Sequence, residues 1–288
     1  MQPYFIAEVS SNHNRDLDRC LAFIETAAGC GCDAVKFQLF RLDELFAPEV
    51  FAAMPQVTGR RAWELPEDYL PVLAQSCRRH GVAFSATPFS LQAVHALQPH
   101  VDFYKIASYE LLWDALLHAC AGTGKPVVLS TGMAALQEVA HAADVLRTAG
   151  CRDMTLLHCT SGYPAPPEQC NLAAVETLRR QFGCAAGWSD HTVHAGVIHR
   201  AVHRWGAQVV EFHLDLDGDG AEYASGHCWL PHQIAPVISQ IRQAFSADGN
   251  GVKEPAPCEE QERNWRADPQ DGLRPLRAVR AGLEAEHA

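Results

Sequence analysis

The stretch from Ala185 to Leu214 reads AAGWSDHTVHAGVIHRAVHRWGAQVVEFHL, and the rest of the chain is interpreted from it. Its first part is a short apolar run that ends in Ser189, Asp190 and His191. A pattern of helical length follows, and a second apolar run then ends at His213. Side chains alternate along a strand, so Glu211 falls on the same face as His213. The stretch therefore predicts a strand, a helix and a second strand, with a histidine at the end of each strand.

The two histidines of this stretch are predicted to lie close together. In a parallel strand–helix–strand unit the strands are neighbours, roughly 4.8 Å apart, so His191 and His213 can bind one ion. Two imidazoles without a thiolate leave coordination positions open, which favours a catalytic Mn²⁺, Mg²⁺, Co²⁺ or Zn²⁺ over a closed structural site. The alternative is that both histidines are polar caps on strand ends.

The same alternation of apolar runs and helical patterns extends outward over most of the chain. Helical patterns, for example at 17–29, 113–121, 134–149 and 172–182, separate eight β-rich runs. The runs are YFIAEV, AVKFQ, VAFSAT, VDFYKIAS, PVVLS, MTLLHCT, AAGWSDH and QVVEFHL. Eight repeats predict an α/β protein with a closed (β/α)8 TIM barrel over residues 1–247. The competing doubly wound sheet usually carries a glycine-rich loop after its first strand, which this sequence lacks.

The composition of the chain limits which partners the protein is expected to bind and in which compartment it is expected to work. The formal net charge of −11 argues against nucleic acid or an acidic membrane as partner, because such surfaces are bound by clustered Lys and Arg. Eleven cysteines in a chain of 288 residues, opening MQPYFIAEV without a basic or long apolar segment, predict a cytoplasmic protein with free thiols. No apolar run approaches the roughly 20 residues that a membrane span needs.

Polar side chains follow most of the predicted strands at their carboxyl ends, which form the active-site face of a closed barrel. Two of them are lysines, Lys36 and Lys105, inside strand patterns where a charge must find a partner. One buried lysine is compatible with a structural ion pair. Two, with a ring of hydroxyl groups at the neighbouring strand ends, favour a cradle for a dianionic phosphate or a carboxylate.

Six motifs, FIAEVSSNHN, DAVKFQLF, YKIASYE, KPVVLSTGMA, LLHCTSGYPAPPE and WSDHT, occur in this order and resemble the sialic-acid synthase (N-acetylneuraminate synthase) family over about residues 4–213. The resemblance implies a (β/α)8 barrel that condenses phosphoenolpyruvate with N-acetylmannosamine, or with a related amino sugar or aldose. The product would be a 2-keto-3-deoxy sugar acid, with phosphate released. It also implies a divalent metal, with Mn²⁺ expected before Mg²⁺ or Co²⁺, and a homodimer.

The resemblance also implies roles for particular residues. His191 and His213 would bind the metal. Phosphoenolpyruvate would be held by Lys36, Thr87, Lys105, Ser108, Ser130 and Ser189. The sugar would face Gln38, Glu110, Ser161 and Tyr163. Water must add to the reacting carbon before phosphate leaves, and a carboxylate can manage its proton. Glu110 is our first candidate for this role and Glu8 our second.

The sequence departs from the family pattern after His213. Where the family usually shows a loop ending in Gly-Pro-Asp, this chain reads DLDGDGAEYASGHCWLP. We expect Asp217, Asp219 or Glu222 to replace the acceptor-binding aspartate, the alternative being a solvated acidic turn. His227 is the additional histidine of interest in this loop.

Residues 248–288 are rich in Pro, Gly and charge and predict a short irregular C-terminal tail. The family typically continues into an antifreeze-like domain that lends an arginine to the partner's active site, and this sequence is expected to lack that domain. We expect Arg274 or Arg277 to approach a barrel mouth, the alternative being a solvated basic end.

Two other functions remain open from the residues. One is a metal-dependent barrel hydrolase or lyase that uses two histidines to activate water, but such an enzyme has no need of two lysines and a ring of hydroxyls. The other is a non-catalytic binding barrel, because a fold alone does not establish an activity.

Overall fold

The computed structural model describes residues 2–285. The chain divides into two compact units, Met1–Phe245 and Ser246–Ala288. The predicted boundary after residue 247 lies close to this division.

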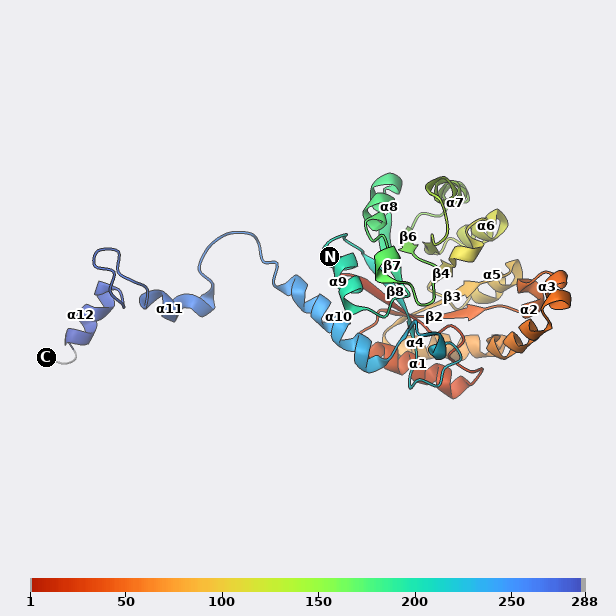
Figure 1. The fold of residues 1–288 in the computed structure, drawn as a ribbon, viewed down its shortest axis with the longest axis horizontal. Helices are drawn as coiled ribbons and strands as arrows, with labels where there is room; N and C mark the ends of the chain where they lie inside the picture. Colours follow the sequence, from red (N-terminus) through yellow and green to blue (C-terminus); the bar gives the residue numbers. More distant parts are fainter. Residues whose placement is uncertain (1, 286–288) are drawn as a thin grey trace. The chain divides into compact units, whose positions relative to one another are not determined.

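The first unit is the predicted (β/α)8 barrel (Figure 1). Each strand pairs in parallel with the next, and β1 pairs with β8, which closes the barrel. This closure excludes the alternative prediction of an open, doubly wound sheet. The barrel strands are β1 (Tyr4–Glu8), β2 (Ala34–Leu39), β3 (Ala83–Pro88), β4 (Phe103–Ile106), β5 (Val127–Ser130), β6 (Met154–Cys159), β7 (Ala185–Asp190) and β8 (Val209–Leu214).

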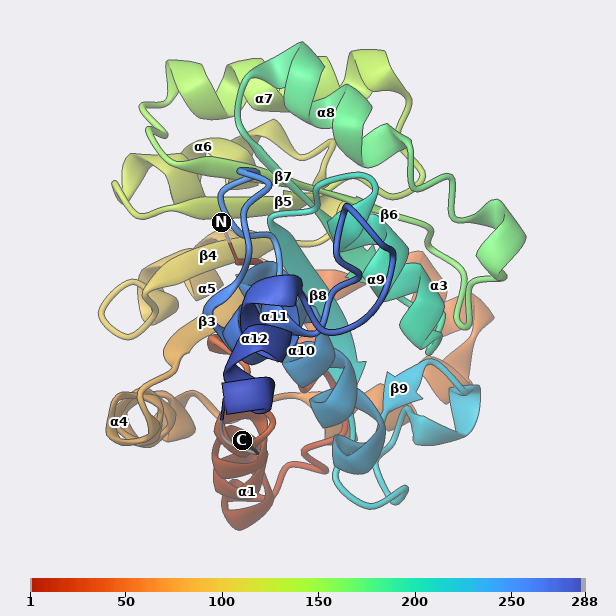
Figure 2. The same ribbon diagram turned by 90° about the vertical axis from the view of Figure 1, so that its left-hand side faces the viewer.

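Helices surround these strands (Figure 2). The helices are amphipathic, and each packs its apolar stripe on the strands. They are α1 (Leu17–Gly29), α4 (Leu70–His80), α5 (Leu91–Leu97), α6 (Asp114–Gly122), α7 (Leu136–Thr148), α8 (Ala174–Phe182), α9 (Ala195–His203) and α10 (Pro231–Ser246). The helix predicted at 17–29 is confirmed at both ends, and the other three patterns are confirmed with ends shifted by one or two residues.

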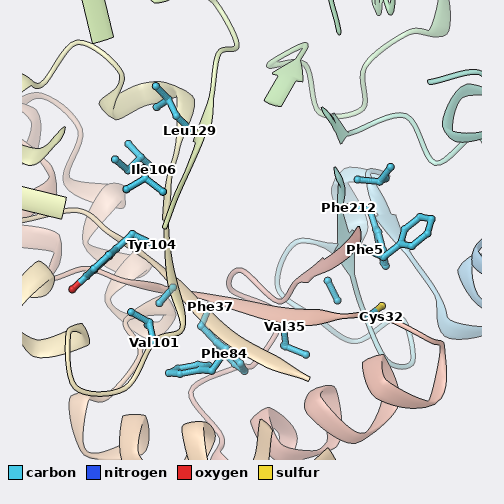
Figure 3. Packing of buried hydrophobic residues seen from close by; sticks show 14 of the residues in the cluster. Phe5, Cys32, Val35, Phe37, Phe84, Val101, Tyr104, Ile106, Leu129 and Phe212 are labelled. Atoms are coloured by element: carbon cyan, nitrogen blue, oxygen red, sulfur yellow. The ribbon is translucent and has the colours of Figure 1, made fainter. Parts of the chain in front are cut away.

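Outward-facing strand residues build the main core. Phe37 of β2 and Phe84 of β3 lie beside each other with ring centroids 6.1 Å apart (Figure 3). Phe5 of β1 and Phe212 of β8 are fully buried at the closing strand pair. Burial of such aromatic side chains is the main favourable term that holds the helices on the barrel.

Inward-facing residues recur at every second position of a strand, because successive side chains point to opposite faces. Their polarity changes along the barrel axis. The amino-terminal layer is apolar and consists of Ile6, Ala34, Phe103, Val128, Leu157 and Val209. Two positions further along the same strands stand Glu8, Lys36, Lys105, Ser130, Cys159 and Glu211. The barrel is therefore plugged by apolar side chains at one end and lined by polar ones at the other.

Strands β7 and β8 approach each other closely at Gly187. A Cβ atom placed on Gly187 would lie 2.1 Å from the carbonyl oxygen of Val209 and 2.7 Å from a methyl carbon of Leu157. Only glycine fits this approach.

Two regions of the chain contain elements that were not predicted from the sequence. Between β2 and α4 the chain forms α2 (Leu42–Leu45), α3 (Pro48–Ala53) and the 3₁₀ helix η1 (Pro55–Trp63), followed by η2 (Glu67–Tyr69). After β8, the short strand β9 (Cys228–Trp229) pairs in parallel with the end of β8. Further 3₁₀ turns are η3 (Ser108–Glu110), η4 (Pro167–Gln169) and η5 (Tyr223–Ser225).

The second unit contains η6 (Pro257–Glu259), α11 (Glu260–Asn264) and α12 (Arg277–Ala285). Asp271 pairs with Arg277 at 3.2 Å and with Arg280 at 2.6 Å. The tail is thus less irregular than predicted, and Arg277 has partners inside its own unit. Within residues 2–285, no helix has the length and apolar character to span a membrane.

Candidate active site

The carboxyl ends of the barrel strands surround a cavity of about 640 Å³. Most of the side chains predicted as site residues line it, because successive strands end on the same face. These are Glu8, Lys36, Gln38, Lys105, Ser108, Glu110, Ser130, Tyr163, Ser189, His191, His213 and Glu222. The cavity is large enough for two small substrates side by side.

Two lysines and two carboxylates meet at the base of this cavity. Lys36 Nζ lies 2.7 Å from Glu8 and 3.8 Å from Glu211, and Lys105 Nζ lies 3.1 Å from Glu211. All four side chains are buried. Burial alone would raise the pKa of Glu211, but the charges of Lys105 and Lys36 outweigh it and hold this pKa well below its usual range. Glu211 was not among the predicted site residues, although its position on the His213 face of its strand was a signal for it.

Hydroxyl groups stand around the lysines. Thr87, which does not line the cavity, accepts a hydrogen bond from Lys36 at 3.2 Å, and Ser189 donates to Glu211 at 3.4 Å. Ser108 accepts from the backbone N–H of Gly132 at 2.9 Å. The buried hydroxyls of Ser130 and Ser161 have no hydrogen-bond partner among the described residues. Ser161 does not line the cavity, but these two hydroxyls retain hydrogen-bonding capacity.

His191 and His213 are brought together as predicted, with ring centroids 5.4 Å apart. His191 Nδ1 lies 2.8 Å from the carbonyl oxygen of Thr160, so Nδ1 carries the proton and Nε2 is left as a ligand atom. Burial and the nearby His213 lower the pKa of His191 to about 3, so it stays neutral. Tyr163 packs on His191 with ring centroids 4.4 Å apart. These features fit a divalent metal, because a ligating histidine usually donates its other N–H to a carbonyl or carboxylate.

The loop at residues 215–227 places only one of its three candidate acidic residues in the cavity. Glu222 lies 3.2 Å from His213 Nδ1 and accepts a 2.6 Å hydrogen bond from Ser10. Burial alone would lower the pKa of His213, but the hydrogen bond and charge of Glu222 raise it above its ordinary value. His227, from the same loop, also lines the cavity.

Asp217 and Asp219 do not line the cavity, so the structure contradicts their prediction as acceptor-binding residues. The reason is Arg19 of α1, whose guanidinium lies 2.8 Å from Asp217 and 2.9 Å from Asp215. Asp217 in turn accepts the backbone N–H of Asp219. Arg19 therefore holds this part of the loop on the outside of the barrel.

The two candidate acid–base carboxylates differ in their surroundings. Glu8 is held by Lys36 and accepts a 2.6 Å hydrogen bond from Gln38. Glu110, at the end of η3, has a buried Oε2 with no hydrogen-bond partner among the described residues. Burial raises the pKa of Glu110 to about 7, although Lys105 acts in the opposite direction. Glu110 can therefore hold or release a proton near neutral pH.

An aromatic wall borders the outer part of the cavity and was not foreseen from the sequence. It consists of Phe40, Phe46, Trp63 and Phe89. Arg60 lies over the Trp63 ring at 5.1 Å and over the Phe46 ring at 5.8 Å. Its neighbour Arg61 pairs with Asp43 at 2.6 Å on the exposed surface. The segment between β2 and α4 thus contributes Phe46, Arg60 and Trp63 to the cavity, while Phe40 follows β2 and Phe89 follows β3.

The fold and the cavity together define a (β/α)8 barrel with lysine, hydroxyl and histidine side chains converging at its mouth. The chain belongs to the NeuB family, whose model matches residues 23–253. It is 36% identical over 266 residues to an uncharacterized protein of Methanocaldococcus jannaschii, covering 89% of this chain and 75% of that one. It is 33% identical over 274 residues to the N,N'-diacetyllegionaminic acid synthase of Campylobacter jejuni, covering 90% and 81%.

Among solved structures, the sialic acid synthetase of Leptospira borgpetersenii, crystallised with citrate, superposes with a TM-score of 0.80 at 29% identity. The match covers 91% of this chain and 90% of that one. Family membership, first suggested by six short motifs, is therefore confirmed over most of the chain.

Proposed function

We propose that this protein condenses phosphoenolpyruvate with an N-acyl amino sugar resembling N-acetylmannosamine, or with a related aldose. The product is a 2-keto-3-deoxy sugar acid of the sialic-acid type, and phosphate is released. The observation that carries the proposal is the pair of buried lysines and the hydroxyl ring in the same cavity as His191 and His213. The proposal agrees with the names of two similar proteins, an N,N'-diacetyllegionaminic acid synthase and a sialic acid synthetase.

Phosphoenolpyruvate would bind at the base of the cavity. Lys36 and Lys105 supply positive charge, and Ser108, Ser130 and Ser189 supply hydroxyl donors for phosphate and carboxylate oxygens. Glu8 and Glu211 keep both lysines oriented toward the base of the barrel. A metal-dependent hydrolase or lyase explains the site less well, because its mechanism does not require two buried lysines.

His191 and His213 would hold the divalent ion, with Mn²⁺ as our first choice and Mg²⁺ or Co²⁺ as alternatives. When bound, such an ion polarises a carbonyl group and stabilises the negative charge that develops on its oxygen. Tyr163 packs against the His191 ring and fixes its orientation. The buried Nδ1–H of His191 donates to Thr160, which keeps Nε2 free to bind the ion.

The sugar would occupy the outer part of the cavity. Gln38, Glu110 and Tyr163 offer polar contacts there, and the aromatic wall offers an apolar surface for an acyl methyl group. The C=C electrons of phosphoenolpyruvate form a new bond from its methylene carbon to the aldehyde carbon, and the aldehyde oxygen takes up a proton to become a hydroxyl. Water then adds to the carbon that carries the phosphate ester oxygen. Glu110 takes the proton of this water, because its raised pKa lets it act near neutral pH. The bond between this carbon and the bridging oxygen then breaks, the added hydroxyl loses its remaining proton to become the keto oxygen, and phosphate leaves.

Phosphate release from phosphoenolpyruvate, measured across a panel of amino sugars and other aldoses, tests the proposal. Release should require an aldose and should yield one keto acid per phosphate. With ¹⁸O in the bridging position of phosphoenolpyruvate, the label should appear in phosphate. Phosphate release that is independent of every sugar would instead indicate hydrolysis.

We also propose that the protein works in the cytoplasm as a homodimer. All eleven cysteines are unpaired, which agrees with a reducing compartment. Sedimentation equilibrium measures the assembly directly, and a monomer at assay concentration would contradict the proposal.

A further inference from the structure

The loop after β8 brings additional ligand atoms to His213. One potential ligand atom from each of His213, Glu222, His227 and Cys228 lies within 4.8 Å of the other three. Two ligands of one metal at about 2.1 Å are at most about 4.2 Å apart, so small side-chain movements would bring these atoms onto one ion.

A single carboxylate oxygen faces both imidazoles. Glu222 Oε2 lies 3.2 Å from His213 Nδ1 and 3.6 Å from His227 Nε2. The two imidazole rings have centroids 4.7 Å apart. The backbone also fixes this arrangement, because the N–H of Glu222 donates to Asn12 at 2.8 Å.

His227 provides an independent observation. Its side chain is buried, lines the cavity, and its Nδ1 has no hydrogen-bond partner among the described residues. A buried polar atom without a partner is costly, and a bound ion is one of the partners that would satisfy it. Cys228 differs, because its thiol accepts a 3.4 Å hydrogen bond from Asn12.

We propose that Glu222 and His227 are metal ligands, which bind the ion together with His213 while His191 faces it from the end of β7. This inference rests on the proposed function, since it extends the metal site assigned there. The resulting set has imidazole nitrogens and one carboxylate oxygen. It suits Mn²⁺, Co²⁺ or Zn²⁺ better than Mg²⁺, which prefers oxygen ligands. Glu222 would then bind metal rather than serve as the acceptor-binding replacement expected from the sequence.

Co²⁺ titration of the chelator-stripped full-length protein tests the ligand set, read by visible absorption and by metal content after gel filtration. The variants are His213→Ala, Glu222→Gln and His227→Ala, each checked for an unchanged thermal melt without metal. His203→Ala is the matched control, because it removes one member of the stacked His199–His203 pair on the outer helix α9. We expect His227→Ala and Glu222→Gln to weaken Co²⁺ by at least roughly tenfold and to alter the d–d bands, with His203→Ala unchanged.

The outcomes separate this inference from the proposed function. If His213→Ala loses Co²⁺ while His227→Ala and Glu222→Gln bind it as the wild type does, the inference is overturned and a site of His191 and His213 stands. If the wild type itself binds no divalent ion, the metal of the proposed function fails and takes the inference with it. An intense thiolate-to-cobalt band would overturn the exclusion of Cys228 from the ligand set.

Discussion

The two buried lysines differ in how firmly carboxylates hold them. Lys36 contacts both Glu8 and Glu211, whereas Lys105 contacts, among the carboxylates that the structure describes, Glu211 alone. Burial lowers the pKa of Lys105, and the charge of Glu211 only partly offsets this effect. An anion that enters the cavity should therefore stabilise the charged form of Lys105 more than that of Lys36.

We expect Lys105→Met to weaken phosphoenolpyruvate binding, because the substitution removes a cation while keeping a side chain of similar length. Loss of one donor to a developing charge costs on the order of 3 kcal/mol, or roughly a hundredfold in rate. Saturation kinetics with phosphoenolpyruvate measures the effect. Lys125→Met is the matched control. Lys125 lies just before β5, away from the carboxyl ends of the strands, and donates a hydrogen bond to the carbonyl oxygen of Val101. Equal losses in both variants would show a structural role for Lys105.

A second expectation concerns pH and Glu110. Its pKa of about 7 means that the carboxyl is protonated below neutral pH and ionised above it. If Glu110 accepts the water proton, kcat/KM should rise with pH through about 7, and Glu110→Gln should lose both this rise and most of the activity. A rising limb that persists in Glu110→Gln would assign the ionisation to another group.

Stability should change in the opposite direction. Because burial raises the folded-state pKa of Glu110, its contribution to stability is present below its ordinary value of 4.5 and is lost as pH rises through about 7. The melting temperature of the wild type should therefore fall, relative to that of Glu110→Gln, between pH 4.5 and pH 8. Parallel curves would contradict the burial of the carboxyl.

Most residues at the base of the cavity were predictable from the sequence, since strand alternation and barrel closure together fix which side chains point inward. The same rule also placed Glu211 correctly on the His213 face. What it did not reveal was that Glu211 pairs with Lys105, because that contact joins β4 to β8 across the barrel.

Among the elements, the loop at residues 215–227 depends on a distant anchor. Arg19 of α1 binds Asp215 and Asp217 and also donates to the backbone oxygen of Asn12 at 2.7 Å. The acidic run alone did not indicate which carboxylate enters the cavity, because the choice depends on an arginine far away in the sequence. The inserted elements α2, α3 and η1 were missed for a related reason: their short turns lack a sustained helical period.

We expect Arg19→Met to loosen this loop and to weaken metal binding more than phosphoenolpyruvate binding. Asp215 is fully buried, and removing the partner of a buried charge typically destabilises by about 3–5 kcal/mol. Hydrogen exchange should show faster exchange at residues 215–228. Arg41→Met is the control, because it breaks an exposed ion pair with Glu67, and solvent screens such pairs strongly. Unchanged exchange in Arg19→Met would contradict the anchoring role.

For the whole molecule, the number of β-rich runs was enough to predict a closed barrel, since eight parallel strands joined by helices have few other ways to cover both faces. No comparable pattern indicated β9, because a strand of two residues is too short to show an alternation. The tail was equally hard to predict, because the contacts of Asp271 with Arg277 and Arg280 follow no periodic pattern.

Gly187 of β7, where β7 closely approaches β8, limits which residue the barrel can accept at this position. Any side chain at Gly187 would be inserted between the two strands that carry His191 and His213. We expect Gly187→Ala to lower the melting temperature and the metal affinity together, measured by calorimetry and Co²⁺ titration. Gly196→Ala on α9, where an added Cβ meets nothing within 4 Å, should be neutral or slightly stabilising. The spacing of β7 and β8 would then depend on an absent side chain, so that variation at this position impairs the protein by adding atoms rather than by removing a functional group.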